Sequence, residues 1–222
     1  MTLRAAELAE RFPRLFHMAE AGSWPSIEKH GLLSTSRLLD LFEIRGNERT
    51  AIEARHRPHN MCIQHPKYGT AIIRDQKPMS DAALKLCLRD GMSPADWYRL
   101  LNRHVFFWLT RARLDRLLSA RAYRNARHTI IEIDTKRLLD VHQIHVFLTP
   151  INTGSTLFKP QPRGRDTFQP IDKYPFDQWR ARRGARDAIA ELVVPDAVND
   201  VTKFVLRVTE EGSGAATKIL VQ

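Results

Sequence analysis

Long apolar runs and cysteines are scarce in this chain of 222 residues. No run of 18 apolar residues occurs, and segment 1–7 lacks the apolar stretch of a signal peptide. We therefore expect a cytoplasmic protein without a membrane partner. The two cysteines, Cys62 and Cys87, have neither metal-ligand spacing nor the density of a disulfide scaffold. Because the histidines of segment 56–65 also lack further ligands, we expect no metal site.

Several nucleotide-binding and hydrolase motifs are absent as well. The sequence has no Walker loop, no dinucleotide-binding glycine fingerprint, and no serine flanked by the glycines of a nucleophile elbow. These absences argue against P-loop, Rossmann and α/β-hydrolase enzymes. With 43% hydrophobic residues and no clean linker, the chain is long enough to bury one core, and we expect one domain over residues 1–222.

Positive charge is in excess, with a formal net charge of +10 and a pI near 10.1. Such an excess attracts polyanions, nucleic acid first, through phosphate contacts and counterion release. The cations gather in segments 111–127 and 159–186, and aromatic residues are interleaved in the second, which suits backbone contact and base stacking. Solvated helix faces and loops are the alternative explanation. The residues predicted to bind nucleic acid are Arg163, Arg165, Trp179, Arg182 and Arg183.

Short apolar strands mixed with helices predict an α+β fold. A polar, irregular stretch at 45–70 predicts a loop-rich region, which begins a helical and loop insertion around 45–103. The predicted helices are 3–12, 23–31, 35–41, 80–90, 93–103, 114–123 and 176–182. The predicted strands are 15–18, 68–76, 105–109, 128–133, 145–148, 188–195 and 204–208.

The strand at 188–195 is interrupted by one carboxylate, Glu191. Burying a carboxylate without a partner costs several kcal/mol, so such a residue is either exposed by strand alternation or kept for a chemical task. The strand alone leaves both interpretations open.

Three segments, far apart in the sequence, add to this clue. His17 lies in the strand 15–18 and is followed by a helix and the sequence His-Gly-Leu-Leu-Ser at 30–34. The aromatic strand 105–109 leads into Arg111, and the sequence Ala-Glu-Leu-Val-Val contains Glu191. Their order and chemistry resemble the ADP-ribosyltransferase superfamily, and the nearest likeness is to DarT-type toxins. Those proteins carry a histidine strand with Gly-Leu, a strand of the type V-P-F-Y-F before an arginine, and a segment of the type A-E-V-L-V.

This resemblance implies a catalytic domain over 1–222, built from a pair of small packed β-sheets with flanking helices. It also implies that NAD is the substrate. The region between the first and second motifs is longer here than in the family, and the insertion at 45–103 can build a different substrate site.

The resemblance further implies roles for single residues. Glu191 would bind the reacting ribose and help to deprotonate the acceptor, and Arg111 would pair with the pyrophosphate or orient the acceptor, with Arg113 as a competitor. Only one of the two adjacent strand aromatics at 107–108 can face the site, because neighbouring side chains point to opposite faces. The residues predicted to bind NAD are His17, Met18, Ser34, Arg74, Phe107, Trp108 and Asn152.

The sequence thus predicts an NAD-dependent ADP-ribosyltransferase that modifies nucleic acid, with a DNA base preferred over RNA, as a toxin or phage-defence factor. An antitoxin is then a candidate partner. One alternative is the related NAD-dependent RNA 2'-phosphotransferase, which shares the early histidine and Gly-Leu but does not depend on Glu191. The other is a basic nucleic-acid-binding module without catalysis.

Overall fold

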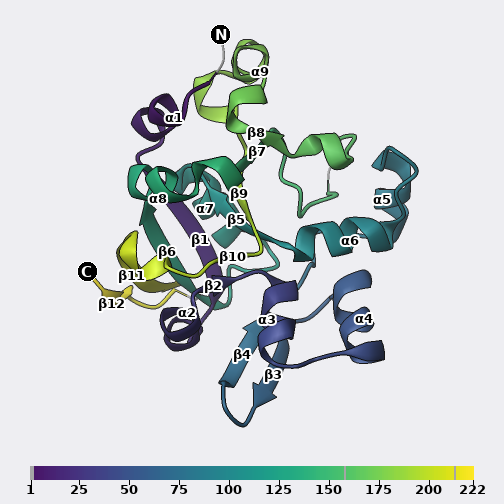
Figure 1. Ribbon diagram of the computed structural model, residues 1–222, viewed down its shortest axis with the longest axis vertical. Coiled ribbons are helices and arrows are strands. Elements are labelled where there is room, and N and C mark those ends of the chain that lie inside the picture. The colour runs from purple at the N-terminus through teal and green to yellow at the C-terminus, as the bar shows by residue number, and fades with distance from the viewer. Residues whose placement is uncertain (1–2, 158, 213) are drawn as a thin grey trace.

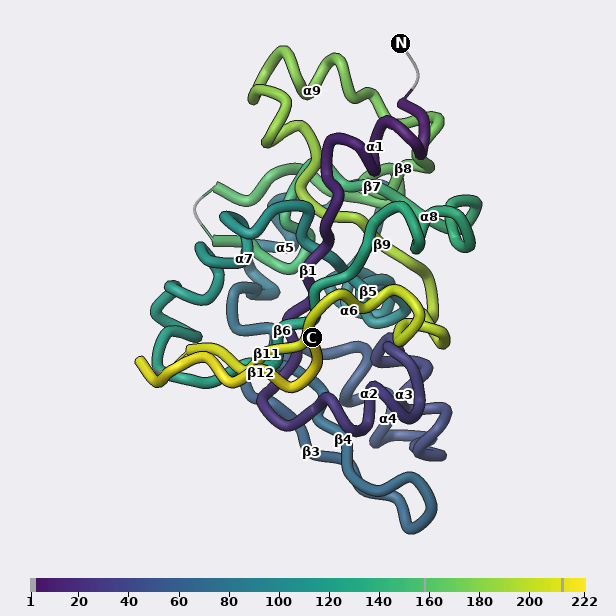
Figure 2. The backbone as a smooth tube through the Cα atoms, turned by 90° about the vertical axis from the view of Figure 1, so that its left-hand side faces the viewer, coloured from purple at the N-terminus to yellow at the C-terminus, as the bar shows by residue number. Residues whose placement is uncertain are grey.

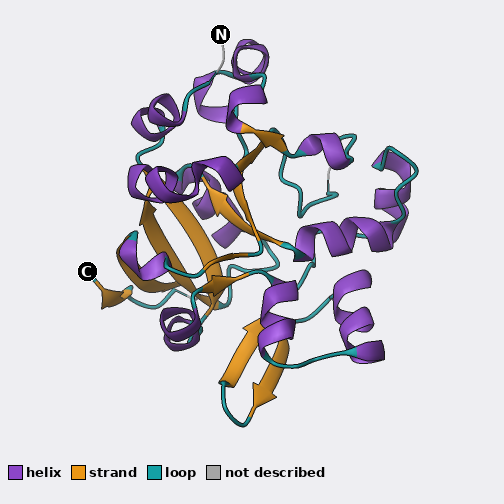
Figure 3. Cartoon of the chain, in the orientation of Figure 1, coloured by secondary structure: helices purple, strands orange, loops and turns teal. Residues whose placement is uncertain are grey.

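The computed structural model describes residues 3–157, 159–212 and 214–222 and has a mixed α+β architecture, as predicted (Figures 1 and 3). Its main sheet is antiparallel and has eight strands in the order β12-β11-β6-β1-β5-β9-β7-β8. These strands are β1 (Arg14–Glu20), β5 (His104–Trp108), β6 (Arg127–Asp134), β7 (Phe147–Thr149), β8 (Gln169–Pro170), β9 (Glu191–Pro195), β11 (Val205–Gly212) and β12 (Lys218–Val221). The helices are α1 (Ala5–Arg11), α2 (Trp24–His30), α3 (Thr35–Leu41), α4 (Gly46–Ala54), α5 (Asp81–Cys87), α6 (Pro94–Asn102), α7 (Arg111–Leu118), α8 (Thr135–His142) and α9 (Phe176–Arg183).

The sheet is nearly divided between β1 and β5. These two strands pair at one position only, Phe16↔Trp108, whereas β1 pairs with β6 along its whole length and β5 pairs with β9 along its whole length. We expected two separate small sheets. The pairing instead joins two four-stranded halves at a single residue pair, and beyond it the strands diverge next to His17 and Met18.

The core lies on the face of the sheet that α1 and α8 cover, as Figure 1 shows. Leu8 of α1 and Leu138 and Leu139 of α8 pack there on Leu15 and Ile133. Helix α8 is absent from the sequence prediction. Its start is nevertheless marked by Asp134, whose side chain accepts a hydrogen bond from the Arg137 amide and caps the helix.

The region 45–103 contains more regular structure than predicted. Instead of a loop-rich stretch, residues 45–70 form α4 and β3 (Met61–His65), and β3 pairs with β4 (Gly69–Ile73) in a hairpin (Figure 3). A separate apolar cluster holds this part together, with Leu39, Ile52 and Ile63 at its centre. The hairpin was missed because β3 buries only Ile63 well and ends in the polar residues Gln64 and His65.

Buried Arg57 ties this region together and to α6. Its Nη1 donates to the Ile52 carbonyl at 2.6 Å, its Nη2 to Asn102 Oδ1 at 2.9 Å, and its Nε to the Arg74 carbonyl at 3.2 Å. A buried guanidinium is tolerated because each nitrogen has an acceptor. These hydrogen bonds fix the chain at the end of β4. The segment that begins there with Arg74 borders the candidate site.

A close approach of backbones fixes the turn after α2. Gly31 has φ 85°, and a Cβ at this position would lie 2.6 Å from the Cα of Asn199. Only glycine fits here. The approach lets β2 (Leu32–Leu33) pair with β10 (Ala197–Val198), so the chain after β9 holds the segment that leads into α3. Within the described residues, no helix is both long and apolar enough to cross a bilayer.

Candidate functional site

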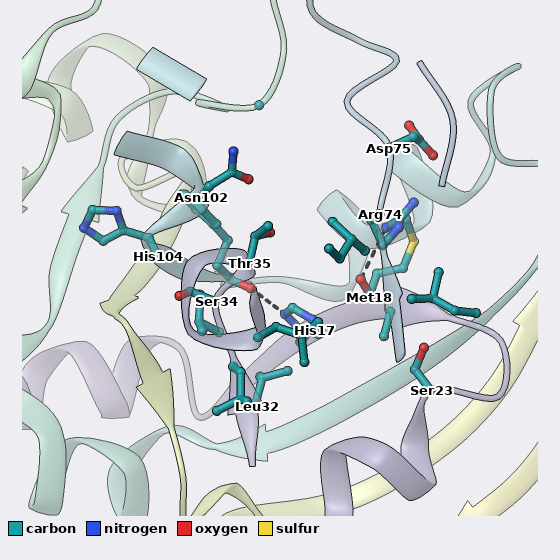
Figure 4. A pocket seen from close by; sticks show the side chains of 18 of the residues that line it. His17, Met18, Ser23, Leu32, Ser34, Thr35, Arg74, Asp75, Asn102 and His104 are labelled. Carbon is teal, nitrogen blue, oxygen red and sulfur yellow. Dashed lines mark hydrogen bonds between the residues drawn. The ribbon is translucent and has the colours of Figure 1, made fainter. Parts of the chain in front are cut away.

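A cavity of about 420 Å³ opens where β1 and β5 diverge (Figure 4). Its wall combines β1, the segment from α2 to α3, the end of β4, strand β5 and the loop 152–154 beside β9. These segments are distant in the sequence, and the divided sheet brings them together. Most of the residues predicted to act on NAD line this cavity: His17, Met18, Ser34, Arg74, Trp108, Asn152 and Glu191.

His17 is held in one tautomer by the strand beside it. Its Nδ1 lies 2.9 Å from the Phe106 carbonyl oxygen (Figure 4), and because a carbonyl only accepts, Nδ1 carries the proton. Burial lowers the pKa of His17 from 6.5 to about 4, and the charge of Arg74 acts in the same direction. The ring is therefore neutral near pH 7, and Nε2 is an acceptor for a ligand hydroxyl.

Arg74 borders the cavity beside Met18, the next residue after His17. Its Nη1 donates to the Met18 carbonyl at 3.2 Å (Figure 4), and its guanidinium lies 5.0 Å from the centre of the Tyr123 ring. Tyr123 in turn donates to Asp75 Oδ1 at 2.8 Å. These contacts fix the arginine, and its charge stays directed at the cavity beside the Met18 backbone.

Glu191 is the first residue of β9 and is only 4% exposed. This burial excludes the solvent-facing interpretation, since both faces of β9 are covered. Its Oε2 accepts hydrogen bonds from Thr149 Oγ1 at 3.0 Å, from the Thr153 amide at 3.2 Å and from Thr153 Oγ1 at 2.8 Å. Among the described residues, no protein group donates to Oε1, which leaves that oxygen for a ligand.

The protonation of Glu191 is balanced near neutral pH. Burial raises its pKa from 4.5 to about 7, against the opposing effects of the threonine hydrogen bonds and the charge of Arg113. A carboxyl group with such a pKa exists in both forms at physiological pH, so it can take up and return a proton.

Thr153, which donates to Glu191, also accepts hydrogen bonds through its backbone carbonyl. Arg163 Nη1 donates to the Thr153 carbonyl at 3.1 Å, and the Trp97 indole donates to the same oxygen at 3.4 Å. Arg163 is 2% exposed and also donates to the Gln161 carbonyl at 3.0 Å. The prediction that Arg163 binds nucleic acid is therefore corrected, because its guanidinium is enclosed by backbone carbonyls and by Trp97.

Two other predicted residues lie outside the cavity. Phe107 is 1% exposed, belongs to the main core and touches His17 edge-on, with ring centres 5.8 Å apart. Arg111 begins α7 and forms a two-pronged ion pair with Glu211 of β11, so it cannot act in the cavity as predicted. Its competitor Arg113 lies closer to Glu191. Its charge acts on Glu191, although its Nη2 is bonded to Asp187 at 2.7 Å.

The remaining predicted residues have local partners or are exposed. Ser34 caps α3 by accepting from the Arg37 amide at 3.2 Å, and Asn152 Oδ1 accepts from the Gly154 amide at 3.1 Å. Both side chains still line the cavity. The predicted nucleic-acid residues other than Arg163 lie on α9, where Arg182 and Arg183 stack on Trp179, and in an exposed turn that contains Arg165.

Two cavity residues were missed in the sequence. Ser23 Oγ and His30 Nε2 are buried and have no hydrogen-bond partner among the described residues, and the same is true of Arg74 Nε. All three residues line the cavity. Unsatisfied buried polar atoms are costly, so their gathering in one cavity indicates a polar ligand. In the sequence, Ser23 belongs to a Ser-Trp-Pro helix start and His30 to a His-Gly helix end. Both patterns indicate where a helix begins or ends, and neither indicates a ligand.

Residues 13–205 match DUF7002, which is described as a family of unknown function, and the chain belongs to this family. The match includes β1 with His17, the whole insertion and β9 with Glu191. No curated protein and no solved structure matches the chain.

Proposed function

We propose that the cavity binds NAD and that the protein transfers ADP-ribose from NAD to a nucleic acid, with a DNA base as the preferred acceptor. The observation that carries the proposal is the convergence of His17 and Glu191. They lie on separate strands, on the two sides of the point where the sheet divides, and both line one cavity. His17 and Glu191 come from the first and last motifs of the order that resembles ADP-ribosyltransferases, and both line the same cavity.

The chemistry of the cavity suits NAD. Its volume of about 420 Å³ lies within the range of small-molecule sites. Neutral His17 offers an acceptor to a ribose hydroxyl, and the Trp108 ring offers a flat apolar surface to nicotinamide. The charge of Arg74 and the unsatisfied atoms of Ser23 and His30 suit the polar and phosphate groups of the dinucleotide.

Glu191 would act on the bond that breaks. In the transfer, the bond between nicotinamide and the ribose C1' carbon breaks, nicotinamide leaves with the bonding electrons, and positive charge develops on the ribose. The free Oε1 of Glu191 can stabilise this charge or hold the adjacent hydroxyl. An amine or ring nitrogen of the acceptor then bonds to C1' and loses a proton, which Glu191, with a pKa of about 7, can accept.

Thr149 and Thr153 have a defined part in this scheme. Because both donate to Oε2, the carboxylate cannot rotate freely, and Oε1 stays directed at the cavity. Arg111 takes no part, since it pairs with Glu211 outside the cavity. The net charge of +10 supports a polyanionic acceptor, and the stacked Arg183 and Trp179 pair supports nucleic acid in particular.

The test is transfer of label. The protein is incubated with NAD labelled in its adenylate phosphate, together with single-stranded DNA, duplex DNA or RNA, and nucleic-acid-bound label is measured. We expect label on DNA, and at least a 100-fold loss in Glu191→Gln, which keeps the shape but cannot take the proton. The matched control is Glu48→Gln, an exposed carboxylate in the first turn of α4, which we expect to behave as wild type. Absence of label on every acceptor, or equal labelling by Glu191→Gln, contradicts the proposal.

A further inference from the structure

A second recess, here called the arginine groove, borders the cavity at the contact between β1 and β5. Its volume is about 530 Å³, and it lies between the α1–β1 junction, the β5–α7 junction and the short turn η4 (Ala185–Asp187). Phe16 lines the groove, and its pairing partner Trp108 lines the cavity. The two spaces therefore meet at one wall.

The groove takes its name from its charge. Among the described residues that line it there are four arginines and no carboxylate: Arg11, Arg14, Arg111 and Arg186. All four are exposed. They come from three separate parts of the chain, so the charge does not follow from one cationic helix face. Arg111, which the motif order singled out and which the cavity does not use, belongs to this set.

Three of these arginines, Arg11, Arg14 and Arg186, remain available to a ligand. Arg186 has no hydrogen-bond or ion-pair partner among the described residues, and Arg11 rests on the Phe176 ring, 5.2 Å from its centre. Arg14 bonds Glu132 at 2.8 Å, but its side chain is 63% exposed. An exposed ion pair contributes only about 0–1 kcal/mol, and a guanidinium has five N–H donors. These contacts orient Arg11 and Arg14 without using all of their donors, whereas each guanidinium nitrogen of Arg111 is already bonded to Asp115 or Glu211.

The groove also adjoins the chain that carries Glu191. The turn η4 leads through three buried residues, 188–190, directly into Glu191. On the far side of η4 lies α9, which sits beside α1 at one end of the molecule in both views (Figures 1 and 2). The groove is therefore linked by a short stretch of chain to Glu191 on one side and to α9, which carries the Arg183 and Trp179 pair, on the other.

We propose that the arginine groove holds the phosphodiester backbone of the nucleic acid whose base is the acceptor. Planar guanidinium groups match phosphate oxygens in two-pronged geometry, and several of them along one recess match a repeating phosphate better than a single anion. The proposal rests on the nucleic-acid acceptor of the proposed function. The predicted nucleic-acid contact surface thus shifts from the segment around Arg163 to groove residues that lie close in the sequence to His17 and Glu191.

The test measures binding without NAD, so it is independent of transfer. Affinity for fluorescent single-stranded DNA, RNA, duplex DNA and an acidic peptide is measured at several salt concentrations. The variant is Arg11→Gln with Arg186→Gln, which removes two cations from the groove. The matched control is Arg45→Gln with Arg55→Gln, which removes the same charge from exposed positions at the two ends of α4, at the opposite end of the molecule (Figure 1).

We expect the groove variant to lower the slope of log affinity against log salt by about 1.4 for single strands, because each phosphate contact contributes about 0.7. If the two proteins bind equally at 1 M salt, this slope change makes binding by the groove variant at 0.1 M salt about 25-fold weaker than binding by wild type. The control should keep the wild-type slope. Equal weakening in both variants would show a mere net-charge effect and overturn the proposal, as would a groove variant that binds normally. Tighter binding of the acidic peptide than of any nucleic acid also overturns it.

If both transfer and groove binding fail, the acceptor class is wrong. If transfer fails while the groove variant still loses nucleic-acid affinity, the groove stands and the NAD chemistry is wrong. If transfer occurs while the groove variant binds normally, the acceptor enters by another surface.

Discussion

The burial of Glu191 and His17 predicts opposite pH effects on stability, and a single substitution can separate them. Glu191 has a pKa of about 7 in the folded protein against 4.5 when exposed, and His17 has about 4 against 6.5. We propose to replace Glu191 by Gln, which keeps the side-chain volume and removes the titration. The control is His17→Asn, whose amide can still donate to the Phe106 carbonyl.

The signs follow from proton binding. Between pH 4.5 and 7 the folded chain holds a proton on Glu191 that the unfolded chain has lost, so this group's stabilisation is full below pH 4.5 and disappears as the pH rises to 7. Between pH 4 and 6.5 the unfolded chain binds a proton on His17 that the folded chain does not. Its contribution is therefore full above pH 6.5 and is lost as the pH falls to 4. Each shift corresponds to about 3 kcal/mol. In the wild type the two effects nearly cancel.

The assay is urea unfolding followed by tryptophan fluorescence, at a series of pH values from 4 to 8. Relative to wild type, we expect Glu191→Gln to gain about 3 kcal/mol of unfolding free energy as the pH rises from 4.5 to 7. His17→Asn should lose a similar amount between pH 4 and 6.5. A pH-independent difference between Glu191→Gln and wild type would refute the reasoning, because it would mean that the carboxyl group titrates normally and is not held in a low-polarity cavity.

Three further predictions test the surroundings of this site. Thr153→Val removes a hydroxyl that donates to Glu191, so the pKa of Glu191 should rise by roughly one to two units in a carboxyl-carbon NMR titration; an unchanged pKa contradicts the hydrogen-bond assignment. Arg163→Met leaves the Gln161 carbonyl without this donor and the Thr153 carbonyl with only the longer Trp97 contact, so it should lower the unfolding free energy by roughly 2–4 kcal/mol while nucleic-acid affinity is retained, whereas the opposite result would restore the surface role. Gly31→Ala should cost roughly 2–4 kcal/mol because a Cβ meets backbone, and Gly22→Ala, with a similar φ but open space, only about 1 kcal/mol; equal melting temperatures would contradict this difference.

The sequence was sufficient to predict the elements that position the site. The strand with His17, the aromatic strand and the strand with Glu191 all form, and the side chains of His17 and Glu191 line one cavity. These predictions succeeded because short apolar runs with turn signals on both sides determine strands locally. The contacts of Glu191 were not predictable in the same way, since Thr149 and Thr153 reach it only through the pairing of β7 with β9.

The failures have a common physical origin. Arg163 sits in a cationic segment, and such segments are usually solvated, but here the guanidinium packs over Trp97 of α6, which only the tertiary fold brings near. Arg111 follows an aromatic strand as in the family pattern, yet the start of α7 turns it toward Glu211. The β3–β4 hairpin has one weakly buried strand, and its apolar partners lie on α3 and α4. In each case a long-range contact decided the outcome.

The central claim is that Glu191 acts on NAD in the cavity, and release of nicotinamide tests it most directly. Nicotinamide formed from NAD in the presence of DNA is measured by chromatography for wild type and for Glu191→Gln, with NAD binding to both followed by calorimetry. We predict that both proteins bind NAD and that Glu191→Gln releases nicotinamide at least 100-fold more slowly. Equal release by the two proteins, or no binding of NAD to either, would contradict the account.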